Sequence, residues 1–214
     1  MIASRFLTHR PLMDSFQPQS SRRWMMMKRF PVLSLILALA YAGSLCAAEQ
    51  IKSGPQVGDS LGAFNVTKCA GAVDDGVDIG KNLCYRCRNG ERPQVVVFTR
   101  STDPKVIELI QKLDTAIVEH EGEKLRSFVN LLGEDQDALT KTAEKLAAIS
   151  KTSNVPFVVP NEFENGPDNY GINAKAAVTV VLASELGVKA NFAVADAKDL
   201  DVDAVIKDIG KIVE

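Results

Sequence analysis

The sequence predicts an α/β protein, a three-layer sandwich in which helices flank a central mixed β-sheet. Three observations lead to this fold class. Residues 95–98 form a continuous apolar run, too short for a helix and typical of a strand buried on both faces. Residues 106–117 place branched apolar side chains on one helical face. Residues 177–183 and 188–194 are two apolar runs joined by a short turn, which predicts a hairpin.

The other elements follow from the turn and capping signals between these runs. Residues 61–68 predict a first short strand, and residues 69–82, with several glycines and aspartates, predict a loop. Asp103 and Pro104 are typical of a helix start, with the aspartate as cap and the proline in the first turn. The chain continues with a strand within 124–132, a helix opening at 134–135, a strand at 155–159, a polar loop over 161–173 and a last helix after Asp201. This order predicts one domain with a mixed sheet.

The charge is unevenly distributed along the chain. The 25 Lys/Arg and 27 Asp/Glu residues give a formal net charge of −2. Residues 1–48 contain six of the basic residues and one acid, so the rest of the chain carries 19 basic and 26 acidic side chains, a formal charge of −7. An acidic domain without a basic run has no electrostatic footprint for nucleic acid or for an anionic membrane surface.

Residues 25–48 have the three parts of a secretory signal peptide. Lys28 and Arg29 precede an apolar run, and small residues follow up to Ala48. The run is shorter than the roughly twenty apolar residues of a transmembrane helix. We therefore predict cleavage after Ala48 and export to the periplasm or the exterior, with membrane contact only through the signal peptide before cleavage. Lipid modification of Cys46 is the less favoured alternative, because bulky Leu45 precedes it.

The domain boundaries follow from this segment. Residues 1–24 have no periodicity and precede plausible start codons at Met25 to Met27, which favours a start there. The predicted organisation is an N-terminal extension and signal peptide over 1–48, a linker over 49–60 and one domain over 61–214.

Three cysteines remain after the predicted cleavage, and they are the candidate catalytic residues. Cys84 and Cys87 form a CxxC pair, the smallest unit that can cycle between dithiol and disulfide, and Arg86 and Arg88 favour the thiolate by their charge. Cys69 is a third thiol for exchange. The odd number leaves one thiol free unless chains pair or a metal is bound.

Two other interpretations of the three cysteines stay open. A bridge from Cys69 to Cys84 or Cys87 would close a loop of about 15–20 residues and contribute roughly 3 kcal/mol in the chain-entropy model. Alternatively, His120 would complete a Cys₃His metal site. The favoured prediction includes neither a metal nor a cofactor.

Four stretches carry a likeness to a known family. They are Gly58-Asp59 with Phe64 and Val66, then Val95 to Thr99 before a helix, Asn169 to Ile172, and Thr179 to Leu182 before a hairpin turn. In this order they resemble the thioredoxin-like superfamily, in its secreted thiol-disulfide reductase and peroxiredoxin-like form. The resemblance implies a thioredoxin-like sandwich and thiol-disulfide chemistry.

The sequence departs from that family at the usual active site. The family carries its cysteines between the central strand and the next helix, where residues 100–104 of this chain contain none. Val178 stands where the family has a cis-proline. The CxxC is therefore displaced to the connection before the central strand. We expect an exported thioredoxin-like protein with redox activity towards a protein thiol or disulfide client. The alternative is a non-catalytic binding or structural domain. The sequence does not indicate the oligomeric state.

Overall fold

The computed structural model describes residues 51–213, and the predicted signal peptide and the segment before it lie outside this range. The strands are β1 (Val66–Ala70), β2 (Asn82–Leu83), β3 (Gln94–Thr99), β4 (Arg126–Leu131), β5 (Phe157–Pro160), β6 (Val178–Ser184) and β7 (Gly187–Val194). The α-helices are α1 (Tyr85–Asn89), α2 (Pro104–Glu119), α3 (Gln136–Ser150), α4 (Val202–Asp208) and α5 (Gly210–Val213), with 3₁₀ turns at Asp168–Tyr170 and Ala197–Asp199.

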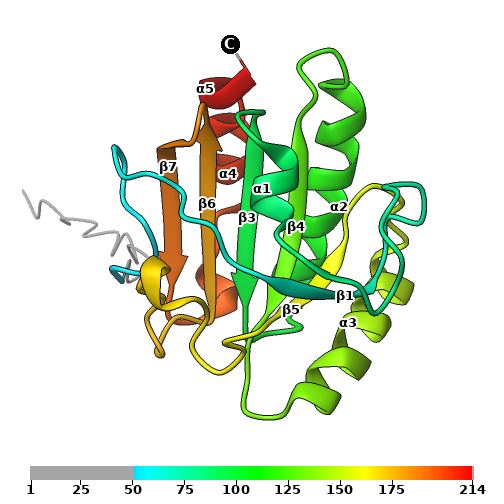
Figure 1. Cartoon of the computed structure of the whole chain (residues 1–214). Coiled ribbons are helices and arrows are strands. Elements are labelled where there is room, and N and C mark those ends of the chain that lie inside the picture. The colour runs from blue at the N-terminus through cyan, green and yellow to red at the C-terminus, as the bar shows by residue number, and fades with distance from the viewer. Residues whose placement is uncertain (1–50, 214) are drawn as a thin grey trace, which may run out of the picture. The chain divides into compact units, whose positions relative to one another are not determined.

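The strands form one mixed sheet in the order β2-β1-β5-β4-β3-β6-β7 (Figure 1). The middle strands β3, β4 and β5 are parallel, whereas β6 pairs with β3 in the antiparallel direction and continues into the hairpin with β7. All six residues of β3 are buried, which explains why its centre, residues 95–98, is an unbroken apolar run rather than an alternating one. The predicted three-layer sandwich and its mixed sheet are confirmed.

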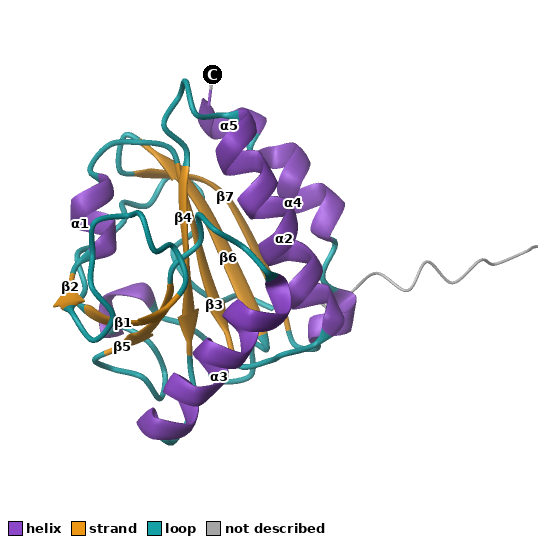
Figure 2. Cartoon of the chain, turned by 90° about the vertical axis from the view of Figure 1, so that its right-hand side faces the viewer, coloured by secondary structure: helices purple, strands orange, loops and turns teal. Residues whose placement is uncertain are grey.

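Alternating side chains of the strands divide the interior into two apolar layers. Val95 and Val97 of β3 pack in the layer under α2, α3, α4 and α5, whereas Val96 and Phe98 pack in the layer that includes Tyr85 of α1. Figure 2 shows α2, α3, α4 and α5 on one side of the sheet and α1 on the other. The CxxC segment is therefore separated from the main helical layer by the whole thickness of the sheet.

Residues 51–61 form an N-terminal arm that lies against the hairpin. The Ile51 amide donates to the carbonyl of Ala193, and the Gly58 amide donates to that of Val188. Ser53 is 1% exposed, and its hydroxyl lies 2.7 Å from that of Thr179. Most of the segment that the sequence predicts as a linker is thus held against β6 and β7 by hydrogen bonds.

Three details of the predicted elements are wrong. The first strand begins at Val66 and not at Leu61, whose amide donates to the carbonyl of Leu186. The strand also includes Cys69, which is predicted to lie in the following loop. A short helix, α1, is not predicted at all. The last helix is two helices, since the chain tightens into i→i+3 hydrogen bonds around Ile209.

Within residues 51–213, no helix is long and apolar enough to cross a bilayer.

Candidate active site around the Cys84–Cys87 disulfide

Helix α1 exists because its two ends are capped and one of its side chains is anchored. Cys84 is the N-cap, with extended backbone angles and a sulfur that accepts the amide hydrogen of Cys87 at 3.0 Å. Gly90 ends the helix at φ 63°, a conformation that glycine adopts without strain. Tyr85 is 4% exposed and stacks on Phe128 at 5.7 Å between ring centroids, which fixes the helix on the sheet.

Cys84 and Cys87 are joined by a disulfide, with their Cα atoms 5.2 Å apart. Cys84 is half-buried at the start of the helix, whereas Cys87 is exposed. The two cysteines therefore differ in exposure and in their surroundings, and only the sulfur of Cys84 accepts a backbone hydrogen bond from the other cysteine. A thiolate formed on Cys84 keeps that hydrogen bond, which favours its charged form.

Two arginines flank the pair. Arg88 donates from Nη2 to the carbonyl of Asp75 at 2.7 Å, which ties the end of α1 to the glycine-rich loop. Arg86 is half-buried, and its Nε is buried without a hydrogen-bond partner among the described residues. Both side chains are cationic guanidinium groups, which favour negative charge on a neighbouring sulfur.

An ion pair beneath α1 holds the loop that leads to the cysteines. Lys68 of β1 is 1% exposed and donates from Nζ to the carboxylate of Asp75 at 2.7 Å and to the carbonyls of Ala72 and Val77. The hydroxyl of Tyr85 donates to the other carboxylate oxygen of Asp75 at 2.6 Å. Burial and this hydrogen bond raise the pKa of Tyr85 well above its ordinary range. Strand β1, the loop and α1 thus form one connected polar network.

The structure does not bring Cys69 to the other two cysteines. Cys69 is a free thiol, 4% exposed, in the layer under the main helices, with its sulfur 3.8 Å from the hydroxyl of Thr140 in α3. Tyr85 of α1 belongs to the layer on the opposite face of the sheet. Burial raises the pKa of the Cys69 thiol. The alternative in which Cys69 is bridged to Cys84 or Cys87 is therefore not the pairing in this structure.

The alternative metal site, made of the three cysteines and His120, is not formed either. His120 is the C-cap of α2, 3.7 Å from Glu123, whereas the three cysteines lie in β1 and at α1. Among residues 51–213, no three His, Cys, Asp or Glu side chains come together as a metal-binding group.

Residues 100–104, where the resembling family has its active-site cysteines, contain no cysteine in this chain. Residues 100–103 connect β3 to α2, and Asp103 caps the helix by accepting from the Lys105 amide at 2.9 Å. Arg100 donates to the carbonyl of Glu164, and burial lowers the pKa of its guanidinium. Val178 is fully buried at the start of β6, and no peptide bond within residues 51–213 is cis. This position holds capping and packing groups, not a nucleophile.

The fold and the bridged pair together define the class: a protein of the thioredoxin fold with a CxxC disulfide before its central strand. Its structure is similar to that of a proposed protein disulfide isomerase from Bacteroides thetaiotaomicron (TM-score 0.53, 12% identity, covering 76% of this chain and 94% of that chain). It is also similar to a proposed thiol:disulfide interchange protein DsbE from Chlorobium tepidum (TM-score 0.53, 14% identity, 74% and 99%). A third is Mycobacterium tuberculosis AhpC (TM-score 0.54, 15% identity, 75% and 99%). At these identities the likeness shows the fold. No protein-family model and no curated protein sequence matches the chain.

Sequence reasoning misses the supporting groups of this site. Lys68, Asp75 and Tyr85 have no motif, because their contacts join three segments that only the fold brings together. Helix α1 has one sequence signal: the Asn89-Gly90 pair ends it, although the same pair is also typical of a tight turn.

Proposed function

We propose that this chain is an exported thiol-disulfide oxidoreductase that exchanges the Cys84–Cys87 disulfide with protein clients. The observation that carries the proposal is the asymmetry of the bridged pair. Cys87 is an exposed residue, and the sulfur of the half-buried Cys84 accepts a backbone hydrogen bond, which we expect to remain when the disulfide is broken. An accessible sulfur beside a stabilised leaving group is what disulfide exchange requires.

The chemistry follows from this difference. A client thiolate attacks the exposed Sγ of Cys87; the Cys84–Cys87 bond breaks, and Cys84 leaves as a thiolate. A second client thiolate then attacks the client sulfur of the mixed disulfide and releases Cys87 as a thiolate. The client is oxidised to a disulfide, and the pair is reduced to a dithiol. The reverse sequence reduces a client, with Cys87 as the attacking sulfur and Cys84 as the resolving one.

Export rests on the signal-peptide pattern of residues 25–48, which lies outside the described residues. A disulfide is the default state of a close cysteine pair in an oxidising compartment, so the bridged pair is compatible with export. N-terminal sequencing of the mature protein tests the predicted cleavage after Ala48.

Single cysteine substitutions test the exchange mechanism. We expect Cys84→Ser to trap client mixed disulfides through Cys87, because the resolving sulfur is gone. Cys87→Ser should trap few, because Cys84 is half-buried. Both variants should lose insulin reduction, whereas Cys69→Ala should keep it. The traps are counted by non-reducing gels and mass spectrometry. Trapping through Cys84 instead would contradict the assigned roles, and no turnover in the wild-type protein would contradict the enzyme.

The absence of cysteines from residues 100–104, where the resembling family has its active site, favours one other candidate function. In it the chain is a non-catalytic binding domain whose disulfide only stabilises α1. The resistance of the bridge to reduction separates the two functions. A working pair opens in the native protein under mild dithiothreitol, whereas a purely structural bridge opens only when the protein is unfolded. The fraction of free thiols in native protein at graded reductant is the measurement.

A further inference from the structure

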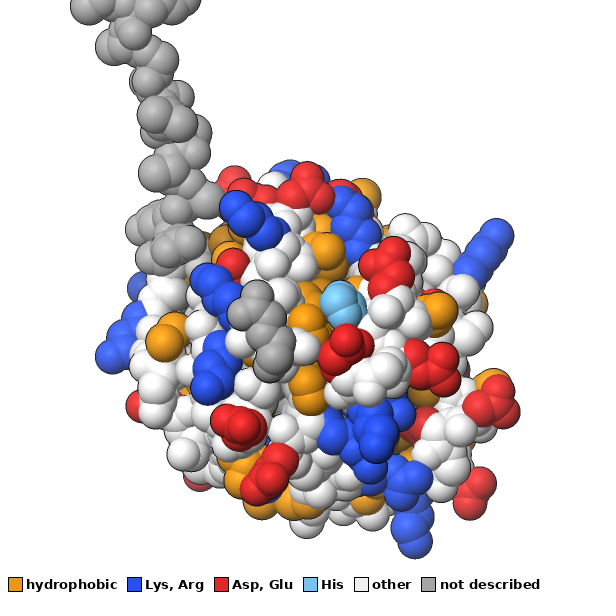
Figure 3. Space-filling model, turned by 90° about the horizontal axis from the view of Figure 1, so that it is seen from above, with side chains coloured by type: hydrophobic (Ala, Val, Ile, Leu, Met, Phe, Trp, Pro, Cys, Tyr) orange, Lys and Arg blue, Asp and Glu red, His pale blue; other side chains and the backbone are white. Residues whose placement is uncertain are grey.

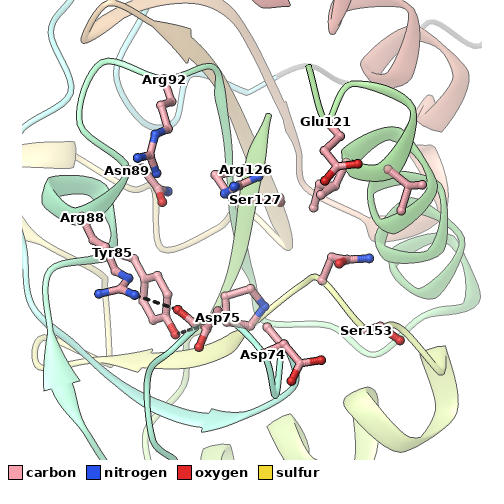
Figure 4. A pocket seen from close by; sticks show the side chains of 15 residues that line it. Asp74, Asp75, Tyr85, Arg88, Asn89, Arg92, Glu121, Arg126, Ser127 and Ser153 are labelled. Atoms are coloured by element: carbon pink, nitrogen blue, oxygen red, sulfur yellow. Dashed lines mark hydrogen bonds between the residues drawn. The ribbon is translucent and has the colours of Figure 1, made fainter. Parts of the chain in front are cut away.

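A cavity beside α1, lined in part by Tyr85, Arg88 and Asn89, has features of a ligand site. It has a volume of about 470 Å³ and lies where β3 and β4 begin and where α2 ends. Figure 4 shows Tyr85 and Arg88 of α1 on one side and Glu121 across from them, with Arg126 and Ser127 between. Neither Cys84 nor Cys87 lines the cavity. The cavity is thus a place for chemistry separate from the disulfide.

Three arginines from different segments line this cavity: Arg88 in α1, Arg92 before β3 and Arg126 at the start of β4. Arg126 is directly opposite Gln94 in the parallel ladder, which places the starts of the two strands side by side. Among residues 51–213, neither Arg92 nor Arg126 has a carboxylate within ion-pair distance, and the guanidinium of Arg126 donates only to the carbonyl of Leu125. Two guanidinium forks are therefore available to an anion.

An independent observation in the same wall is the hydroxyl of Ser127. This residue is 4% exposed, and its Oγ has no hydrogen-bond partner among the described residues, although it lines the cavity. Buried hydroxyls are rarely left without a partner, because the lost hydrogen bond to water is not replaced. Ser127 and Arg126 are adjacent in β4, and both residues line the cavity.

The remaining lining residues restrict the ligand. Ile117, Tyr85 and Pro156 give apolar contacts, which suit a ligand with a hydrocarbon body. Asp74 and Glu121 add negative charge at the cavity, which disfavours a polyanion. The face seen in Figure 3 likewise carries Lys/Arg and Asp/Glu side chains intermixed, without a broad basic surface. Asp75 is already occupied by Lys68 and Tyr85.

We propose that this cavity binds a small organic carboxylate. The carboxylate pairs with Arg92 and Arg126, Ser127 donates to it, and the hydrocarbon body packs on the apolar wall. The site does not require the Cys84–Cys87 chemistry, so the binding proposal can be tested independently of the proposed redox function.

Titration with simple anions tests the site. Benzoate, acetate and inorganic phosphate are added to the purified protein, and amide NMR shifts and calorimetry follow binding. We expect saturable benzoate binding that shifts the amide resonances of Ser127 and Asn89. Acetate should bind at least fivefold more weakly than benzoate, because it lacks the aromatic ring that packs on the apolar wall. Phosphate should bind more weakly than acetate. Phosphate binding as tight as benzoate would overturn the organic ligand, and the absence of saturable binding would overturn the site.

Matched variants locate the contacts. The double variant Arg92→Gln/Arg126→Gln should weaken benzoate at least tenfold, and Ser127→Ala several-fold. Lys124→Gln removes an exposed charge from the turn before β4, outside the cavity, and should leave the affinity for benzoate unchanged. An equal loss of benzoate affinity in Lys124→Gln and in the double arginine variant would mean that the net charge of the protein causes the effect, which would overturn the site. The Cys84→Ser/Cys87→Ser variant should bind benzoate normally, and thermal midpoints confirm that each variant is folded.

Discussion

Lys68 is a charged side chain with almost no contact with solvent, and its position explains much of the site. A lysine is rarely buried unless it is paired, and here all three donor directions of the ammonium group are used, by one carboxylate and two carbonyls. The carboxylate, that of Asp75, also receives the hydroxyl of Tyr85 and the amide of Val77. The network therefore fixes the loop before the CxxC as well as the helix that carries it.

We predict that Lys68→Met destabilises the protein by about 3–5 kcal/mol, the range for removing one partner of a buried ion pair. The reason is that Asp75 and the two carbonyls lose their donor inside the protein. Lys81→Met is the matched control: its side chain is exposed, and it should change stability by less than about 0.5 kcal/mol. Urea denaturation measures both. A similar stability for the two variants would contradict the importance of the pair.

The stability of the fold should decrease at alkaline pH. The pKa of Cys69 is raised above its ordinary value of 9.0 by burial, so above that pH the unfolded chain releases a proton that the folded protein keeps. The contribution of Cys69 to stability is therefore constant well below pH 9 and decreases as the pH rises towards the pKa of the folded protein. We predict that Cys69→Ala flattens this dependence between pH 9 and 10. Urea midpoints at both pH values give the slopes, and equal slopes in the two proteins would contradict the assignment.

Residue patterns predict only part of this site. The CxxC pair and its arginines are visible in the sequence because the spacing itself implies the chemistry. The separation of Cys69 from the pair is not visible, because the face on which a strand residue points depends on the register of β1, which has an irregularity between Lys68 and Ala70.

Among the elements, the capped helices are predicted and the short one is not. Asp103, Asp135 and Asp201 each accept a backbone amide at the start of a helix, as expected for aspartate before an apolar stripe. Helix α1 has five residues, too few to show a helical period, and its stability comes from Tyr85 and its caps. Elements that depend on tertiary contacts leave little periodic signal in the sequence.

The end of α3 offers a test of backbone conformation. Lys151 is the C-cap in the left-handed region, at φ 54°, where a side chain is strained and glycine is not. We predict that Lys151→Gly stabilises the protein by about 0.5–1 kcal/mol. Lys145→Gly, an exposed position inside the same helix, should destabilise it by about 1 kcal/mol. Opposite signs in urea denaturation would confirm the conformation, and two losses would contradict it.

At the scale of the whole molecule, the disulfide is a local link on a much larger sheet. Cys84 and Cys87 are only three residues apart, so the bridge closes a very short loop. The chain-entropy model gives about 2 kcal/mol for such a loop, against a typical stability of about 5–15 kcal/mol for a domain. Neither Cys84 nor Cys87 belongs to a strand of the seven-stranded sheet or to its two apolar layers.

We therefore predict that the reduced protein remains folded, with unchanged far-UV circular dichroism and a stability about 2 kcal/mol lower than that of the oxidised protein. Urea denaturation with and without a phosphine reductant measures the difference. The Cys84→Ser/Cys87→Ser variant should match the reduced protein and show no response to the reductant. Unfolding on reduction alone would mean that the pair is a structural staple, incompatible with repeated exchange.

The N-terminal arm has a consequence for the order in which the chain is made. Ser53 and its partner Thr179 are 126 residues apart, and the amide of Ile51 binds Ala193 in the last strand. A ribosome therefore produces the arm first and its docking surface nearly last. Until residues 171–194 have been synthesised, most of the hydrogen-bond partners of residues 51–60 are absent, and we expect the segment beside the predicted cleavage site to stay open to processing. Docking of the arm is then a late folding event, and we expect chains released before β7 to leave residues 51–60 open to proteolysis.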